Sequence, residues 1–177
     1  MIDDILGKIS TYVTERDKNS TWTPGEDWVQ YSGPYYDEKE YTRAVESLLS
    51  GWFIIGKTGR EFEDVFPEYL GKTHGVMVNS GSSANLLMYS VLKCKNTLPS
   101  KYTLPEGSKF ITPIVCFPTT INPMLQNGYE PVFVDVELPS LNLNLDHVEQ
   151  VLEEDFNNKK EIKGIVFAHV LGNPPDM

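Results

Sequence analysis

The sequence has few cysteines, no excess of positive charge and no long hydrophobic run. Its two cysteines, Cys94 and Cys116, stand in apolar surroundings without C-x-x-C spacing, so we expect reduced core thiols and no metal site. The net charge of −10 argues against a nucleic-acid partner and against binding to a membrane surface. The N-terminus has acidic residues early and no continuous apolar stretch, which is unlike a signal peptide, and no transmembrane segment is expected. These absences together predict a cytoplasmic protein.

What is present is typical of a globular α/β fold. The chain of 177 residues is 40% hydrophobic, enough for one well-buried core. Short β-branched runs alternate with helical patterns, which predicts βαβ units and a parallel-rich sheet with flanking helices. The expected strands are 75–79, 109–115, 131–136 and 163–169, and the expected helices between them are 83–94, 118–127 and 145–156.

The N-terminal region is expected to be organised differently. Residues 1–30 combine a helical pattern with a Pro- and Gly-containing loop, and we treat them as a separate N-terminal helix and loop. Residues 31–177 would form the main domain. Asp37 and Glu40 have the spacing of a capping box and predict that a helix begins there.

The stretch "NSGSSAN", residues 79–85, follows the first expected strand and opens a helix. The backbone N–H groups of Gly81, Ser82 and Ser83 would then face a phosphate at the positive end of that helix. The alternative is a serine that only caps a buried helix. The pattern is neither a Walker loop nor a G-x-G-x-x-G fingerprint, so a nucleotide-binding Rossmann domain is disfavoured.

Other polar and aromatic residues follow the remaining strands, where open α/β sheets bind ligands. Phe117 would present a flat face for a planar ring, or pack in the core. Asp135 follows the third strand and could equally cap a turn, and His169, Gly172 and Asn173 follow the fourth. A phosphate-binding turn, an aromatic face and polar groups at one edge together indicate a phosphorylated, planar cofactor.

These segments resemble a known family. "YLGKTHGVMVNSGSSANLLMYSVL", "CFPTTINPMLQNGYEPVFVDVELPSLNLN" and "IVFAHVLGNPPDM" are similar to the N-terminal part of the DegT/DnrJ/StrS-type sugar aminotransferases. The resemblance covers about residues 30–177. It implies a pyridoxal-phosphate-dependent fold of type I, the aspartate aminotransferase-like class, of which this chain would hold an incomplete large domain.

Within that family the variants "SGSSANL", "FPTTxNP" and "HxLGNP" are closest to the CDP-4-keto-6-deoxyglucose 3-dehydrase branch. The loop "GWFIIGKTGREFE" also resembles that branch, although Ile54 and Ile55 stand where it has two threonines. The resemblance therefore implies a nucleotide-linked 4-keto-6-deoxy sugar as substrate, in deoxysugar or lipopolysaccharide biosynthesis. A nucleotide-sugar aminotransferase is the alternative.

The resemblance also assigns roles to individual residues. Gly81, Ser82 and Ser83 would hold the phosphate of pyridoxal or pyridoxamine phosphate, Phe117 would stack on its ring, and Thr120 would line the same pocket. His169 and Asn173 would line the cofactor or substrate pocket. Gly56 and Lys57 would reach the substrate across the interface of a homodimer.

The family's Schiff-base lysine, or the histidine that replaces it in 3-dehydrases, would follow residue 177. No catalytic residue is therefore assigned in this chain, and the iron–sulfur cysteines of the dehydrase are not expected in it either. We accordingly expect a truncated chain that is inactive alone and tends to self-associate. A non-catalytic α/β module is the remaining alternative.

Overall fold

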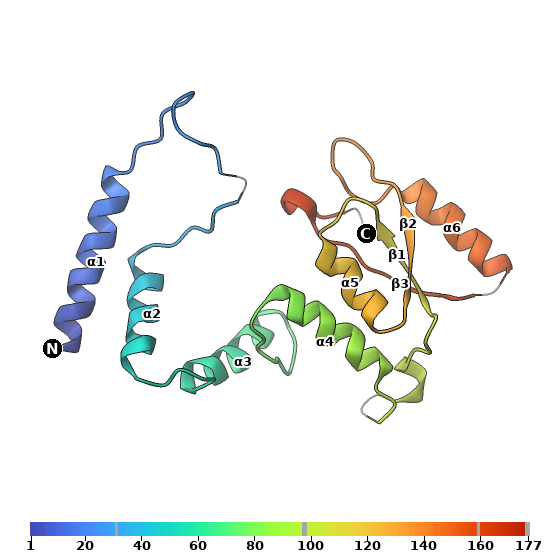
Figure 1. Ribbon diagram of the computed structural model, residues 1–177, viewed down its shortest axis with the longest axis horizontal. Helices are drawn as coiled ribbons and strands as arrows, with labels where there is room; N and C mark the ends of the chain where they lie inside the picture. The colour runs from blue at the N-terminus through green and yellow to red at the C-terminus, as the bar shows by residue number, and fades with distance from the viewer. Residues whose placement is uncertain (31, 97–98, 159, 176–177) are drawn as a thin grey trace. The chain divides into compact units, whose positions relative to one another are not determined.

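The computed structural model describes residues 1–30, 32–96, 99–158 and 160–175. The chain divides into two compact units, Met1–Met77 and Val78–Met177. Figure 1 shows the elements of each unit in chain order. In the part of the chain that the structure describes, every helix is too short or too polar to cross a bilayer.

The first unit consists of helices α1 (Ile2–Asn19), α2 (Glu38–Leu49) and α3 (Lys57–Tyr69). The predicted capping box at α2 is confirmed: the Asp37 carboxylate accepts the N–H of Lys39, and the Glu40 carboxylate accepts the N–H of Asp37. Hydrogen bonding to Lys39 lowers the pKa of Asp37. α1 lies against α2, where the Arg16 guanidinium donates to the Tyr41 hydroxyl over 3.3 Å. These contacts give α2 a fixed start and a fixed neighbour.

The second unit is built on a three-stranded parallel sheet with strand order β2-β1-β3. The strands are β1 (Lys109–Pro113), β2 (Glu130–Val134) and β3 (Ile162–Ile165). Helices α4 (Gly81–Lys93), α5 (Pro118–Gln126) and α6 (Leu145–Asn157) connect or precede them, with short 3-10 turns η1 (Ser100–Tyr102) and η2 (Val170–Gly172). The predicted alternation of helices and parallel strands from residue 81 onward is therefore confirmed.

Each face of the sheet is covered by different helices (Figure 1). Successive side chains of a strand point to opposite faces, so neighbouring residues of β1 pack against different helices. Phe110 of β1 packs with Tyr89 of α4 and Met124 of α5. Its neighbour Ile111 packs with Val134 and with Val148 of α6 on the other face. The carboxyl ends of all three strands consequently lie at one edge of a sheet that has α4 and α5 on one side.

Two expectations are wrong. Residues 75–79 form no strand, because a strand needs a partner ladder and the Met77 N–H is donated instead to the Glu63 carboxylate, over 2.8 Å. Cys94 is exposed rather than buried, since it follows the last turn of α4 at the surface, and Cys116 is half-buried. Burial raises the pKa of the Cys116 thiol.

Candidate functional site

The turn that opens α4 is held by its own serines. The Ser80 hydroxyl caps the helix by accepting the Ser83 N–H over 3.2 Å, and the Ser83 hydroxyl donates to Asn79 Oδ1 over 2.6 Å. Ser80 therefore caps α4, a helix whose side chains are mostly not buried. The N–H groups of Gly81 and Ser82 belong to the first turn, where helix geometry provides no acceptor. A Cβ added at Gly81 would meet no atom within 4 Å, so an anion has room to approach.

The start of α5 presents the aromatic residue. Phe117 is the N-cap of α5 and is 68% exposed, and Pro118 occupies the first position, where its fixed φ suits a helix start. The Thr120 N–H donates to the Phe117 carbonyl over 2.9 Å, which ties Phe117 to the first turn. Thr120 itself is buried. Of these two predicted site residues, Phe117 is accessible to a ligand, whereas Thr120 is buried and is joined to it by a backbone hydrogen bond.

Side chains of α4 bind the backbone of α5 at both ends. The Asn85 amide donates to the Thr119 carbonyl over 3.0 Å, and the Tyr89 hydroxyl lies 3.5 Å from the Thr120 carbonyl. Farther along, the Lys93 ammonium donates to the Asn127 carbonyl over 3.2 Å. The two helices therefore run in the same direction, with both N-termini at the carboxyl edge of the sheet. These contacts place the first turns of α4 and α5 side by side.

Beneath this edge lies a buried polar group. Thr112 of β1 is fully buried, and its hydroxyl has no hydrogen-bond partner among the described residues. Alternation along β1 places it on the same face as Phe110, which is the face of α4 and α5. Burial, with a smaller contribution from Cys116, raises the pKa of Tyr89 to about 12, so its hydroxyl stays protonated and able to donate. Thr112, Asn85 and Tyr89 were not singled out from the sequence.

The segments that follow β2 and β3 end at the same edge. The Asp135 N–H donates to Nδ1 of His147, and the Asp135 carboxylate accepts the Val136 N–H, so Asp135 acts as a turn residue. After β3, the exposed His169 ring stacks on Phe167 with centroids 5.8 Å apart.

The segment that carries His169 and Asn173 is fastened to the loop after β2. Asn173 donates to the Ser140 carbonyl over 3.2 Å, and Asn142 donates to the Pro174 carbonyl over 3.3 Å. Strand order and parallel direction place this segment at the carboxyl edge, with Asn173 exposed. The structure thus brings seven predicted residues to one edge of the second unit: Gly81, Ser82, Ser83, Phe117, Thr120, His169 and Asn173.

The other two predicted residues, Gly56 and Lys57, belong to the first unit. Gly56 is the N-cap of α3 and Lys57 its first residue. A Cβ at Gly56 would lie 2.5 Å from Cδ1 of Trp52, so the loop needs glycine there for close packing of the indole. Their part in binding substrate stays a prediction.

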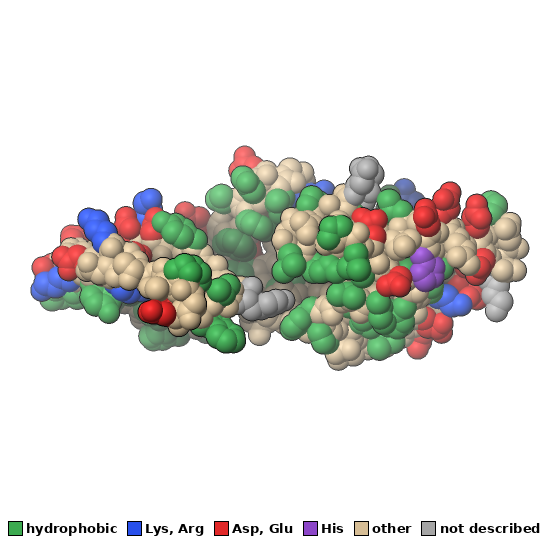
Figure 2. Space-filling view, turned by 90° about the horizontal axis from the view of Figure 1, so that it is seen from above, with side chains coloured by type: hydrophobic (Ala, Val, Ile, Leu, Met, Phe, Trp, Pro, Cys, Tyr) green, Lys and Arg blue, Asp and Glu red, His purple; other side chains and the backbone are tan. Residues whose placement is uncertain are grey.

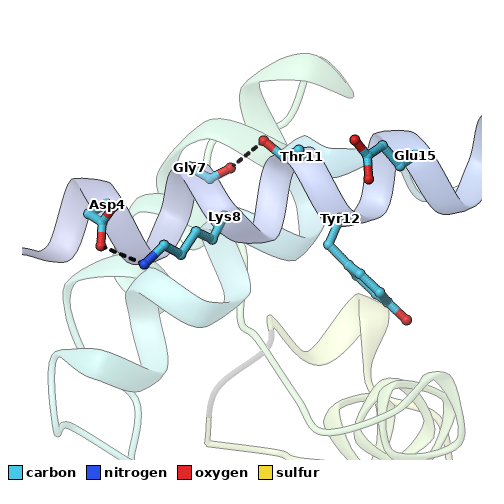
Figure 3. Close-up of a pocket in the computed structure, with 6 residues that line it drawn as sticks. All are labelled: Asp4, Gly7, Lys8, Thr11, Tyr12 and Glu15. Atoms are coloured by element: carbon cyan, nitrogen blue, oxygen red, sulfur yellow. Dashed lines mark hydrogen bonds and ion pairs between the residues drawn. The ribbon is translucent and has the colours of Figure 1, made fainter.

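Two further surface features are weaker candidates for a binding site. A hollow of about 520 Å³ lies along α1 (Figure 3), but one helix supplies its whole lining and the Lys8 ammonium is already paired with Asp4 over 3.1 Å. Hydrophobic side chains are exposed elsewhere too, as Figure 2 shows on one face of the molecule. Exposure alone therefore does not distinguish Phe117 from the other exposed hydrophobic side chains.

Comparison with known proteins relates this geometry to a family. Residues 34–177 match the DegT/DnrJ/EryC1/StrS aminotransferase family. A dTDP-4-dehydro-2,6-dideoxy-D-glucose 3-dehydratase of Saccharopolyspora spinosa is 38% identical over 97% of this chain and 35% of its own length. The lipopolysaccharide biosynthesis protein RfbH of Salmonella typhimurium is 35% identical over 97% of this chain and 37% of its own. The chain thus spans about a third of the length of these curated relatives.

Solved structures agree with the family match. The Escherichia coli GDP-4-keto-6-deoxy-D-mannose-3-dehydratase, solved with bound hydrated PLP, superposes with a TM-score of 0.63 at 30% identity, over 76% of this chain and 32% of that one. The predicted fold class is confirmed by this likeness together with the observed parallel sheet and its flanking helices. The chain belongs to the DegT/DnrJ/EryC1/StrS aminotransferase family and contains part of the PLP-dependent aminotransferase fold.

Proposed function

We propose that the carboxyl edge of the second unit binds pyridoxal 5'-phosphate or pyridoxamine 5'-phosphate. The observation that carries the proposal is the pairing of two helix N-termini, with uncommitted first-turn N–H groups on α4 and the exposed Phe117 ring on α5. A phosphate is stabilised at such a helix end by N–H groups and by the helix dipole. The open space at Gly81 and the exposed aromatic face fit a phosphorylated, planar group.

Each residue at this edge has a distinct task in the proposal. The N–H groups of Gly81 and Ser82, with the Ser82 hydroxyl, bind the phosphate, while Phe117 stacks on the ring. Ser83 holds the turn in place, because its N–H is donated to Ser80 and its hydroxyl to Asn79. Thr120 supports Phe117 from the buried side. When bound, the cofactor supplies an electron sink for breaking bonds of the substrate.

The reaction we propose for the whole protein is dehydration at C3 of a nucleotide-linked 4-keto-6-deoxy sugar, in deoxysugar or lipopolysaccharide biosynthesis. The support is the 38% identity, over almost all of this chain, with a nucleotide-sugar 3-dehydratase. His169 and Asn173 would contact the sugar from the same edge. Gly56 and Lys57 would contact it from a second subunit of a homodimer, the Lys57 ammonium pairing with the diphosphate.

The test is a binding titration of the full chain with pyridoxamine phosphate. This form lacks the aldehyde and does not react with surface lysines, so its affinity reports the phosphate and ring contacts alone. We expect Phe117→Ala to weaken binding roughly two- to tenfold, since an aromatic contact of this kind contributes ~0.5–1.5 kcal/mol. Phe156→Ala is the matched control, because Phe156 is 67% exposed and lies in the last turn of α6, which covers the opposite face of the sheet from α4 and α5.

A second pair of variants tests the phosphate end. Replacing both Ser82 and Ser83 by alanine should weaken binding of pyridoxamine phosphate and of inorganic phosphate alike. Ser90→Ala, on the same helix, should change neither. If the unsubstituted chain binds no pyridoxamine phosphate, the cofactor proposal is wrong and the non-catalytic module remains. If the sugar product keeps its C3 hydroxyl and carries a new amino group, the whole protein is an aminotransferase and the dehydration is wrong.

A further inference from the structure

A proline interrupts the hydrogen bonding of α5 at the point where α4 contacts it. Pro123 lies inside α5 and has no N–H. In an α-helix the N–H of residue 123 would bond to the carbonyl of residue 119. The Thr119 carbonyl is therefore deprived of its helical donor.

The Asn85 side chain supplies the donor that Pro123 lacks. Its amide Nδ2 donates to the Thr119 carbonyl over 3.0 Å, in a half-buried position. Asn85 lies one turn beyond the Gly81–Ser83 turn on α4, and Thr119 lies in the first turn of α5, two residues after Phe117. One hydrogen bond thus joins the phosphate-binding turn to the turn that carries the stacking ring.

Resting on the proposed function, we infer that Asn85 is a positioning residue that sets the ring of Phe117 relative to the phosphate-binding turn by replacing the backbone hydrogen bond lost at Pro123. The Thr120 N–H bond to the Phe117 carbonyl, 2.9 Å long, transmits this position to Phe117. The next contact along α4, from Tyr89 to the Thr120 carbonyl, is longer at 3.5 Å and fixes the turn less well. Asn85 consequently acts on the ring contact and leaves the phosphate contacts intact.

The experiment compares two probes, pyridoxamine phosphate and inorganic phosphate, by ³¹P NMR titration of the full chain. Asn85→Leu keeps the branched shape of the side chain, with some added volume, and removes the donor. We expect it to weaken the binding of pyridoxamine phosphate about fivefold and the binding of inorganic phosphate less than twofold. Ser90→Ala is the matched control, since the Ser90 hydroxyl also reaches α5, at Asn127 Oδ1 over 3.2 Å, but at the opposite end of the helix pair.

A compensating variant separates positioning from general stability. Pro123→Ala restores an N–H at residue 123, which can bond to the Thr119 carbonyl. In that background Asn85→Leu should weaken the binding of pyridoxamine phosphate by less than twofold. If the role of Asn85 were purely structural, the effects of the two substitutions on binding would instead add.

The outcomes distinguish the inference from the function on which it rests. If the unsubstituted chain binds pyridoxamine phosphate and Asn85→Leu weakens both probes equally, or neither, the positioning role is wrong while the cofactor site stands. The same holds if the loss persists unchanged with Pro123→Ala. If the unsubstituted chain binds inorganic phosphate but gains nothing from the pyridine ring, the cofactor site and the positioning role are both wrong.

Discussion

Replacement of Asp155 should loosen the strand that leads to the His169–Asn173 segment. Asp155 lies in the last turn of α6, and its carboxylate accepts the Glu161 N–H over 2.9 Å and the Ile162 N–H over 3.1 Å. These are the N–H groups at the start of β3. A hydrogen bond to a charged group contributes ~1.5–3 kcal/mol, and partial exposure places this half-buried pair toward the low end. We therefore expect Asp155→Ala to lower the free energy of unfolding of β3 by about 2–4 kcal/mol.

Asp155→Asn provides a graded version of the same change. An amide has one oxygen to accept with and presents an NH₂ group to the second N–H, so about half of the loss is expected. Native-state hydrogen exchange at the β3 amides measures the local free energy directly, without requiring both units to unfold together. Glu154→Ala is the control, since the Glu154 carboxylate accepts the Gln150 amide of the same helix, over 3.1 Å, and not a β3 N–H. A change below about 0.5 kcal/mol for Asp155→Ala would refute the assigned role of the carboxylate.

Three other outcomes are expected. Burial raises the pKa of Tyr89 to about 12, so the unfolded chain loses this proton before the folded one as pH rises above 10, and the free energy of unfolding falls. Tyr89→Phe should make this fall smaller by about 2 kcal/mol at pH 12, as measured by urea unfolding. Iodoacetamide should modify the exposed Cys94 about tenfold faster than Cys116, whose thiol pKa is raised by burial, as followed by mass spectrometry. Gly56→Ala should displace the Trp52 indole, since the added Cβ would lie 2.5 Å from it, and shift the tryptophan emission.

Local signals in the sequence predicted most element boundaries in the second unit. Pro118 at a first helical position is a short-range signal, and α5 begins at it, as expected. The helix expected from residue 83 begins two residues earlier, at Gly81, directly after the Ser80 cap. The strand expected at 75–79 failed because strand formation depends on a partner, which a β-branched run does not specify. Cys94 was misplaced for a similar reason, since apolar neighbours in sequence do not reveal which side of a helix end faces solvent.

The candidate site was predictable in its components but not in its connections. The serine turn, Phe117 and the segment after β3 each follow from the rule that ligands bind at the carboxyl ends of parallel strands. The bond from Asn85 to Thr119 joins residues 34 positions apart, so no local pattern shows it. The signal that was available is Pro123, whose missing N–H implies a donor from elsewhere for the Thr119 carbonyl.

The contacts of α4 with α5 recur at residues 85, 89 and 93, one every fourth position. Because each residue of an α-helix advances the side-chain direction by about 100°, inserting or deleting a single residue between Ser83 and Asn85 would turn all three side chains away from α5 together. A point substitution removes one contact, whereas a change in length removes the whole set. Helix α4 should therefore tolerate substitution of its exposed residues far better than any insertion or deletion.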